Sequence, residues 1–229
     1  MKILLCIFLF FVVSKKDKIS VAPPTVVANT QAIKTINYDS CKIAIHSIKQ
    51  KQKVHWQKIS TAQQEKIFVN AVVQTIIPAW IGTPWDFNGV TQTPQQGKIA
   101  CGYFVTTVLR DAGVELQRIK LAQAASQKII TTLALKKDIK LCCNKSIENF
   151  VQLIKSTGYG LYVVGLDNHT GFIYNDGKEV YFIHSSVMGT RNVQKEIAAD
   201  SKVLTMSKYK IVGKISANNS LLNKWINAK

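Results

Sequence analysis

The chain has 229 residues, of which 47% are hydrophobic, and it carries 30 basic but only 13 acidic side chains. This hydrophobic content excludes a wholly disordered chain, and the length suffices for one domain with a sizeable core and an extension. The formal net charge of +17 favours anionic partners, but all except three of the basic residues are lysines. Specific nucleic-acid recognition relies on the bidentate contacts of arginine, so anionic polymers or lipids are favoured over nucleic acid.

The first residues have the pattern of an export signal. Lys2 precedes an apolar run of eleven residues, Ile3–Val13, and three lysines follow within the next five residues. The run is too short to span a bilayer but has the length of the apolar region of a secretory signal. We therefore expect residues 1–22 to be a signal peptide and lead-in, and the mature chain to have no transmembrane span. The protein would be exported to the periplasm, the cell envelope or the medium; an uncleaved membrane-surface anchor is the alternative.

Three further segments are predicted after the signal. Residues 23–59 form a Lys-rich N-terminal extension, partly helical and of unknown role, which includes His46 and His55 as exposed side chains. Residues 60–218 form the main domain, and residues 219–229 form a C-terminal tail. No internal repeat is present, and a monomer is expected.

Four cysteines remain after removal of the signal, namely Cys41, Cys101, Cys142 and Cys143. They are too few for a disulfide scaffold, and no pair has the CxxC spacing of a zinc site. No metal ion is therefore expected. Whether Cys41 pairs with Cys142 or Cys143 stays open at this point.

The first part of the main domain has helical patterns. Ser60 and Gln63 have the spacing of a capping box at a helix start, and a loop over residues 82–97 follows this helix. A second helix is predicted from Cys101 to Ala112, with Gly113 after its end. One or two helices follow in 116–135, and the last runs from Ser146 to Thr157, with Gly158 after its end.

From Leu161 onward the sequence becomes rich in β-branched and aromatic residues separated by turn residues. The predicted strands are 161–166, 170–174, 180–184 and 209–216. Helices followed by an antiparallel sheet define an α+β fold.

Cys101 is placed where a helix begins. A helix N-terminus lowers the pKa of a thiol and offers backbone N–H groups that can bind an oxyanion. Gly102 beside it would let a substrate backbone approach closely. Taken alone, this pattern fits a small core cysteine equally well.

Two later histidines add a second element to this pattern. The dipeptide Asp176-Gly177 predicts a two-residue hairpin loop, and that register places His169 directly opposite His184, on one face of the sheet and about 5 Å apart. One imidazole could then orient the other, as a nucleophile's base requires. The neighbouring Asp167-Asn168 is the alternative orienter.

Four segments together resemble the NlpC-type cell-wall peptidases, a papain-like superfamily with a Cys-His-His triad. In that family a Gly-x-x-Tyr-x-Trp-Gly-Gly loop precedes Asp-Cys-Ser-Gly-Phe-Val at a helix start, and a His-Val-Gly-Ile strand precedes one ending in Phe-Ile-His. The corresponding segments are GTPWDFNG at 82–89, ACGYFV at 100–105, HTGFI at 169–173 and YFIHSS at 181–186. The resemblance covers roughly residues 80–190, and Trp85, Ala100 and Gly102-Tyr103 depart from the family's pattern.

The resemblance implies a papain-like fold, with N-terminal helices that carry the catalytic cysteine packed on a C-terminal sheet that carries the histidines. Cys101 would be the nucleophile, His169 the base and His184 the residue that orients it, without metal or organic cofactor. Trp85 takes the place of the family's substrate-facing Tyr, and Gly102 follows the nucleophile. Residues 60–218 would then be the catalytic domain.

Asp86 is the remaining candidate for substrate binding, because an acidic residue in a basic protein could bind a substrate ammonium group. The expected reaction is acyl transfer from an amide to Cys101 and then to water, in peptidoglycan stem peptides or another amide substrate. The Cys101 backbone N–H and a donor from the loop 82–97 would bind the oxyanion. The alternatives are a same-fold amidase or acyltransferase, a catalytically inactive wall-binding module, and a basic nucleic-acid binder.

Overall fold

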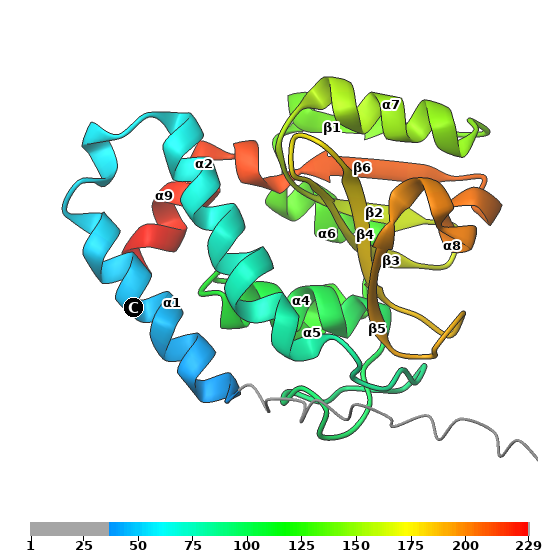
Figure 1. The fold of residues 1–229 in the computed structure, drawn as a ribbon, viewed down its shortest axis with the longest axis horizontal. Helices are drawn as coiled ribbons and strands as arrows, with labels where there is room; N and C mark the ends of the chain where they lie inside the picture. The colour runs from blue at the N-terminus through cyan, green and yellow to red at the C-terminus, as the bar shows by residue number, and fades with distance from the viewer. Residues whose placement is uncertain (1–36, 229) are drawn as a thin grey trace, which may run out of the picture. The chain divides into compact units, whose positions relative to one another are not determined.

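One antiparallel sheet of six strands organises the residues that the computed structural model describes, 37–228 (Figure 1). The strand order is β1-β6-β2-β3-β4-β5. The strands are β1 (Ile139–Leu141), β2 (Gly160–Leu166), β3 (Thr170–Asn175), β4 (Val180–Ser185), β5 (Val193–Ile197) and β6 (Lys210–Lys214). The four predicted strands correspond to β2, β3, β4 and β6. Sequence periodicity misses β1, which is too short, and β5, which is a largely polar edge strand.

Helices cover the sheet, which confirms the predicted α+β class. The α-helices are α1 (Tyr38–Lys53), α2 (Thr61–Asn70), α3 (Ile77–Trp80), α4 (Cys101–Asp111), α5 (Arg118–Ala122), α6 (Ser126–Leu133), α7 (Ile147–Thr157), α8 (Lys202–Met206) and α9 (Asn219–Asn227). A π-helical turn, η2 (Ala71–Ile76), joins α2 to α3. Short 3₁₀ turns are η1 (Trp56–Lys58), η3 (Lys136–Asp138), η4 (Ala198–Asp200) and η5 (Ile215–Ala217). The predicted signal peptide and the beginning of the predicted extension lie outside the described residues.

The ends of the helices follow the sequence signals. The Ser60 hydroxyl accepts from the Gln63 backbone N–H, and the Gln63 side-chain oxygen accepts from the Ser60 N–H, so the capping box is present. Gly113 and Gly158 follow α4 and α7 with φ of +91° each. Glycine adopts this left-handed conformation without a steric penalty, which lets the chain leave the helix.

Each face of the sheet buries a separate hydrophobic layer. Because side chains alternate along a strand, neighbouring residues of β2 to β4 enter different layers. The face toward α4 and α6 shares a core with α1, α2 and α9, while the opposite face packs against α7 and α8 (Figure 1). The strand residues of the first layer include Leu161, Val163, Phe172 and Ile183, and those of the second include Tyr162, Val164, Ile173 and Phe182.

The predicted extension and tail, where described, are packed parts of this same core. Trp225 of α9 contacts Trp56 and Phe68, with ring centroids 5.9 and 5.3 Å apart. Its indole Nε1 donates to the carbonyl of Ala112 at the end of α4, at 2.6 Å. Residues 37–228 belong to one compact unit, so the boundaries predicted at 59/60 and 218/219 do not separate domains.

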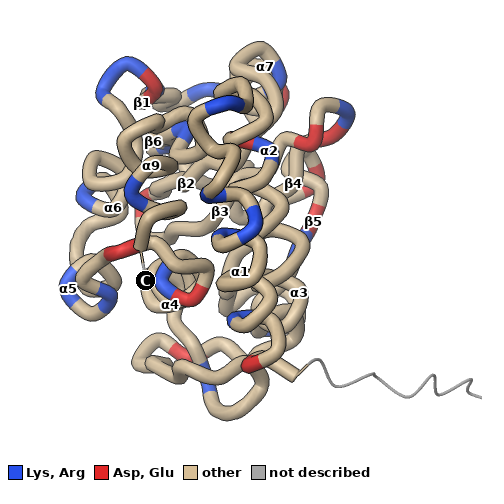
Figure 2. Tube along the Cα trace, turned by 90° about the vertical axis from the view of Figure 1, so that its left-hand side faces the viewer, with Lys and Arg blue, Asp and Glu red and all other residues tan. Residues whose placement is uncertain are grey.

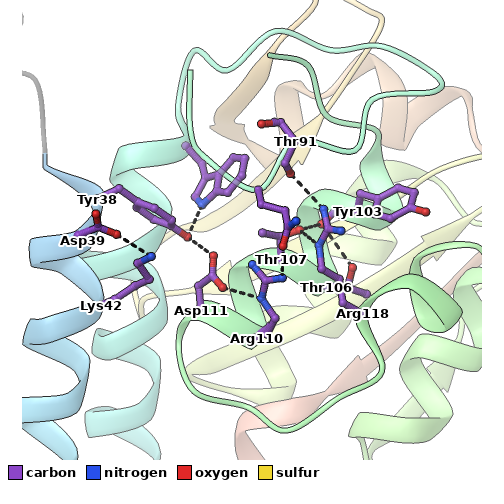
Figure 3. Close-up of polar contacts among 12 residues, drawn as sticks. Tyr38, Asp39, Lys42, Thr91, Tyr103, Thr106, Thr107, Arg110, Asp111 and Arg118 are labelled. Atoms are coloured by element: carbon purple, nitrogen blue, oxygen red, sulfur yellow. Dashed lines mark hydrogen bonds and ion pairs between the residues drawn. The ribbon is translucent and has the colours of Figure 1, made fainter. Parts of the chain in front are cut away.

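Polar contacts hold α4 from two sides (Figure 3). On one side, Tyr38 of α1 donates its hydroxyl to Asp111 at 2.7 Å and accepts from the indole of Trp80 at 2.8 Å. On the other side, Arg118 donates to the Thr107 hydroxyl at 2.7 Å and to carbonyls of the loop 82–97 at 2.8 and 3.1 Å. These contacts fix α4 relative to α1, α3, α5 and the loop.

The hairpin between β3 and β4 differs from the predicted register. Its tight turn is centred on Gly177-Lys178 rather than on Asp176-Gly177, because Asp176 N–H donates to the carbonyl of Glu179 and Asn175 pairs with Val180. The Asp176 carboxylate accepts from the backbone N–H groups of Lys178 and Glu179, which places Asp176 before the turn. Gly177 then takes the first loop position with φ of +94°.

Charge is distributed over many elements. Figure 2 shows Lys and Arg on several helices and turns, with acidic residues between them, rather than on one element alone. None of the helices between residues 37 and 228 combines the length and the hydrophobicity that crossing a bilayer requires.

Candidate active site

The candidate site begins at the N-terminus of α4, where Cys101 is the first helical residue. Ala100 precedes it and provides no side-chain hydrogen bond, whereas Ser60 and Ser146 cap α2 and α7. Alanine at this position costs a helix about 1 kcal/mol relative to a serine cap. The uncapped start leaves the first backbone N–H groups of α4 available to a ligand, as an oxyanion site requires.

One hydrogen bond holds the start of α4 against the end of β4, and the first residue of β3 also lies beside this helix start. The hydroxyl of Ser185 in β4 donates to the carbonyl of Ile99 at 2.7 Å, two residues before Cys101. The backbone N–H of Thr170, which begins β3, lies near enough to the Cys101 sulfur to act on its pKa. Thr170 and Ser185 directly follow the two predicted histidines, and Cys101 and His169 line one cleft.

The two histidines meet, although not in the predicted pairing. Continuing the observed register, His184 faces Gly171, and His169 lies two residues away on the same face of the sheet. His169 Nε2 is nevertheless 2.8 Å from His184 Nδ1, with the ring planes at 82°. Gly171 makes this diagonal contact possible, since a Cβ there would lie 2.8 Å from the His184 Cβ and 2.7 Å from the ring of Phe182.

This contact determines which ring nitrogen of each histidine faces the other ring. His169 uses Nε2 for its partner, so Nδ1 is the nitrogen left for the Cys101 thiol. His184 is completely buried and stacks on Phe182, with ring centroids 3.8 Å apart, whereas His169 is half-buried at the edge of a cleft.

Two residues of β5 extend the site beyond the predicted set. His184 Nε2 lies 3.1 Å from the Oε1 of Glu196 and 3.1 Å from the side-chain nitrogen of Gln194. In the register of β4 and β5, His184 faces Gln194, and Glu196 is the next residue on the same face. Sequence reasoning misses both because no strand is predicted at 193–197. The only sequence signal is that Gln194 and Glu196 are alternate residues of the segment VQKEI, as residues on one face of a strand are.

Cys101 and His169 line one cleft of about 430 Å³. The turn between α5 and α6 forms one wall with Ala122, Ala124 and Ala125, and Leu166, Asn168 and Tyr209 lie among the other lining residues. Asp167 is the one charged carboxylate among the lining residues, and no Lys or Arg lines the cleft. A cleft of this size with one carboxylate and no cation suits a peptide backbone with small side chains better than an anionic group.

The three predicted substrate contacts have different positions. Gly102 lines the cleft, but a Cβ there would lie 2.4 Å from the carbonyl oxygen of Ala122. The glycine therefore permits the close approach of the protein's own α5, rather than of a substrate as the sequence suggested.

Trp85 and Asp86 are not among the residues that line the cleft, and neither is any other residue of the loop 82–97. The Trp85 ring lies 5.9 Å from the guanidinium of Arg191, and Asp86 forms an ion pair with Lys98 at 3.3 Å. The structure thus does not bring these two side chains to Cys101. A loop donor for the oxyanion is likewise not found at the cleft.

Burial keeps the thiol and the imidazoles neutral. It raises the pKa of Cys101 above its usual value, although N–H groups of Thr170 and Gly102 act in the opposite direction. The N–H groups at the helix start thus lower this pKa as expected, but burial outweighs them in the free protein. Burial, together with the charge that His184 would carry, lowers the pKa of His169 to about 3. Burial also lowers the pKa of His184, opposed by its hydrogen bond to Glu196.

The alternative orienters beside His169 have other contacts. The Asp167 carboxylate accepts from the hydroxyl of Ser207 at 2.9 Å and from the backbone N–H groups of Lys208 and Tyr209 at 2.7 and 3.1 Å. Asn168 lines the cleft. The residue hydrogen-bonded to the His169 ring is His184.

The remaining candidate groups form no second centre. Cys41, Cys101, Cys142 and Cys143 are all free thiols, which answers the question of a disulfide with Cys41. Within residues 37–228, no three His, Cys, Asp or Glu side chains are grouped as ligands for a metal ion.

The site thus combines a thiol at an uncapped helix start, an imidazole with a free Nδ1, and a second imidazole that orients the first. A nucleophile, a base and a group that orients the base are the parts that acyl transfer requires. Neither a family model, nor a curated protein, nor a solved structure matches this chain.

Proposed function

We propose that the protein is a cysteine hydrolase with a papain-like arrangement, which cleaves an amide bond. The observation that carries the proposal is the 2.8 Å contact between His169 Nε2 and His184 Nδ1, together with the cleft that His169 and Cys101 line in common. A buried pair of histidines of this kind is costly to a fold, since both rings lose solvation. This cost has a functional reason where the pair supplies a base of defined orientation.

The reaction starts from a neutral thiol and a neutral imidazole. As the Cys101 sulfur attacks the carbonyl carbon, its proton passes to Nδ1 of His169, and the carbonyl oxygen takes the negative charge. The free N–H groups at the start of α4 stabilise that oxyanion. The His169 imidazolium then protonates the leaving amine, which leaves a thioester on Cys101.

Hydrolysis of the thioester reverses these roles. His169, neutral again, removes a proton from water as the water oxygen attacks the thioester carbon. Collapse of the intermediate expels the thiolate, which takes the proton back from His169 and restores the resting pair. If an amine attacks in place of water, the same steps produce an acyltransferase.

The proposed substrate is a peptide of the cell wall. Support comes from the resemblance of residues 80–190 to NlpC-type peptidases, from the predicted export signal, and from a cleft without Lys or Arg that has small side chains along one wall. The basic surface outside the cleft fits an anionic envelope, which would bring the enzyme to its polymer.

The test is digestion of purified peptidoglycan, with the released fragments identified by mass spectrometry. Cys101→Ala should abolish fragment release, because only the nucleophile is lost. Cys143→Ala, which removes a half-buried thiol that does not line the cleft, should leave it unchanged. Binding to peptidoglycan without any thiol-dependent cleavage would instead indicate a wall-binding module, and salt-sensitive DNA binding a nucleic-acid protein.

A further inference from the structure

Glu196 ends a continuous line of hydrogen bonds that begins at the cleft. Its Oε1 lies 3.1 Å from His184 Nε2, and His184 Nδ1 lies 2.8 Å from His169 Nε2. His184 has no exposed surface, and the side chain of Glu196 is 28% exposed. A carboxylate in partial contact with water can stay ionised while the bond it accepts is shielded from solvent.

Each neutral imidazole carries one ring proton, so the line can be protonated in two ways. In the first, His184 donates Nε2–H to Glu196, and its bare Nδ1 accepts Nε2–H from His169. His169 Nδ1 is then bare and can accept a proton from the thiol. In the second, His184 donates Nδ1–H to His169 Nε2, so that His169 carries its proton on Nδ1 and cannot act as a base.

The two β5 side chains favour opposite arrangements. Gln194 places its amide nitrogen 3.1 Å from His184 Nε2, and an amide N–H can only donate to a bare ring nitrogen. An ionised Glu196 can only accept, and a bond to a charged group is about twice as strong as a neutral one. Burial alone would raise the pKa of Glu196, but hydrogen bonds from His184 and Ser201 help to hold it below its usual range.

Gln194 does not oppose the stronger bond. A half-turn of its amide exchanges oxygen and nitrogen, so that the oxygen also accepts from His184 Nε2–H while the NH₂ group donates to the Thr190 hydroxyl, which lies 3.1 Å away. Glu196 therefore decides the tautomer, and Gln194 can adapt to it.

We propose that Glu196 is a positioning residue, which acts through His184 to keep His169 in the tautomer whose Nδ1 is free to take the Cys101 proton. This inference rests on the proposed function and deepens it. During attack, the thiol proton moves to His169 Nδ1, while the Nε2–H groups of both histidines stay in their hydrogen bonds. Glu196 touches neither substrate nor thiol.

The test is Glu196→Gln, which keeps the shape of the side chain and removes its charge. Ring ¹⁵N shifts from long-range ¹H–¹⁵N spectra at neutral pH report which nitrogen of each histidine is protonated. The wild type should show Nε2–H for both His169 and His184, and Glu196→Gln should move proton occupancy toward Nδ1. The control Glu148→Gln, an exposed carboxylate of α7, should give the wild-type spectrum.

Alkylation by iodoacetamide provides the second readout. Peptide mapping should show the rate at Cys101 reduced about tenfold in Glu196→Gln, as expected for partial loss of a general base. The rate at Cys143 should be unchanged in the same sample. If Glu196→Gln does not fold, Glu196→Asp keeps the charge and should retain the wild-type tautomers.

Two results would overturn the inference: His169 protonated on Nδ1 in the wild type, or wild-type tautomers and Cys101 reactivity in Glu196→Gln. Failure of the proposed function has a different signature, because it would appear as absence of amide cleavage by the wild type. The ring-nitrogen spectra decide the role of Glu196 in either case.

Discussion

The turns at the two ends of β3 have the same length, but the aspartate in each makes contacts of a different range. At one end, Asp167-Asn168 forms a two-residue loop closed by the bond from Leu166 N–H to the His169 carbonyl. The Asp167 carboxylate reaches out to residues 207–209, about forty positions later in the chain. At the other end, Asp176 accepts only from backbone groups of its own turn.

The difference shows that a turn beside a site needs contacts that a simple chain reversal does not need. A turn that only reverses the chain can be stabilised locally, as Asp176 and Gly177 do. The turn before His169 must also hold an imidazole in position at a cleft whose other walls come from distant elements. Its carboxylate therefore ties it to the segment that carries Tyr209, which lines the same cleft.

The largest expected effect comes from replacing the two histidines, His169 just before β3 and His184 in β4. His169→Ala should reduce amide cleavage by about a thousandfold, because it removes the base. His184→Ala should be impaired by about tenfold to a hundredfold, since His169 can still reach the thiol part of the time. His184→Asn should recover part of this loss, because its amide oxygen can accept from the His169 Nε2–H.

The measurement is kcat/KM for the three variants, with thermal melts to confirm folding. Wild-type activity in His184→Ala combined with loss of activity in Asn168→Ala would show that the orienter lies beside His169 instead.

The next effect compares two glycines of the same hairpin. Gly171→Ala would place a Cβ within 3 Å of His184, Phe182 and the Ile183 carbonyl, so we expect a loss of about 3 kcal/mol of stability and of the histidine contact. Gly177→Ala has open space but φ of +94°, and should cost only about 1 kcal/mol without loss of activity. Urea unfolding and cleavage assays on both variants check this; equal effects would contradict it.

The comparison also shows which parts of the site a sequence can predict. The β-strand pattern identifies β3 and β4, and turn residues identify the hairpin between them. Whether the loop is Asp176-Gly177 or Gly177-Lys178 depends on the contacts of one carboxylate, which sequence alone does not reveal. The error shifts the facing partner of His184 by two residues, and since side chains alternate with period two, His169 stays on the same face.

Glu196, Trp85 and Asp86 show the limits of such predictions. Glu196 lies in a polar edge strand, whose membership of the sheet depends on pairing with β4 rather than on its own composition. Trp85 and Asp86 belong to a loop whose path is set by backbone bonds to distant residues, such as Trp85 N–H to the Arg191 carbonyl. Local pattern does not determine contacts of this long range.

The histidine pair should also make the stability of the protein depend on pH. His169 and His184 have lowered pKa values in the folded protein, that of His169 about 3, whereas unfolded histidine titrates near 6.5. Below pH 6.5 the unfolded chain takes up protons that the folded site does not, so stability is present above this pH and lost as the pH falls. From pH 7 to 5, His169 alone should contribute a loss of about 2 kcal/mol.

Urea unfolding at pH 7 and pH 5 measures this loss. His169→Asn cannot titrate, so its free energy of unfolding should fall by about 2 kcal/mol less than that of the wild type over the same interval. An equal fall in both proteins would mean that the imidazole is protonated in the folded state at pH 5.

The smallest effect tests the two aspartates directly. Asp167→Ala and Asp176→Ala each remove a carboxylate that accepts backbone N–H groups near a two-residue loop, so both should lower the melting temperature slightly. Only Asp167→Ala should also lower kcat/KM, because it releases the turn before His169 from residues 207–209 and with it the position of Tyr209 at the cleft. A misplacement of 1 Å can cost about a hundredfold in rate, and the intact Leu166–His169 bond should limit the displacement, so we expect about tenfold. Ser207→Ala removes one of the same bonds from the other side and should reproduce part of this loss. If Asp176→Ala lowers kcat/KM as much as Asp167→Ala does, the two turns act on the site through the stability of the sheet as a whole, and the long-range bonds of Asp167 have no special role in placing His169.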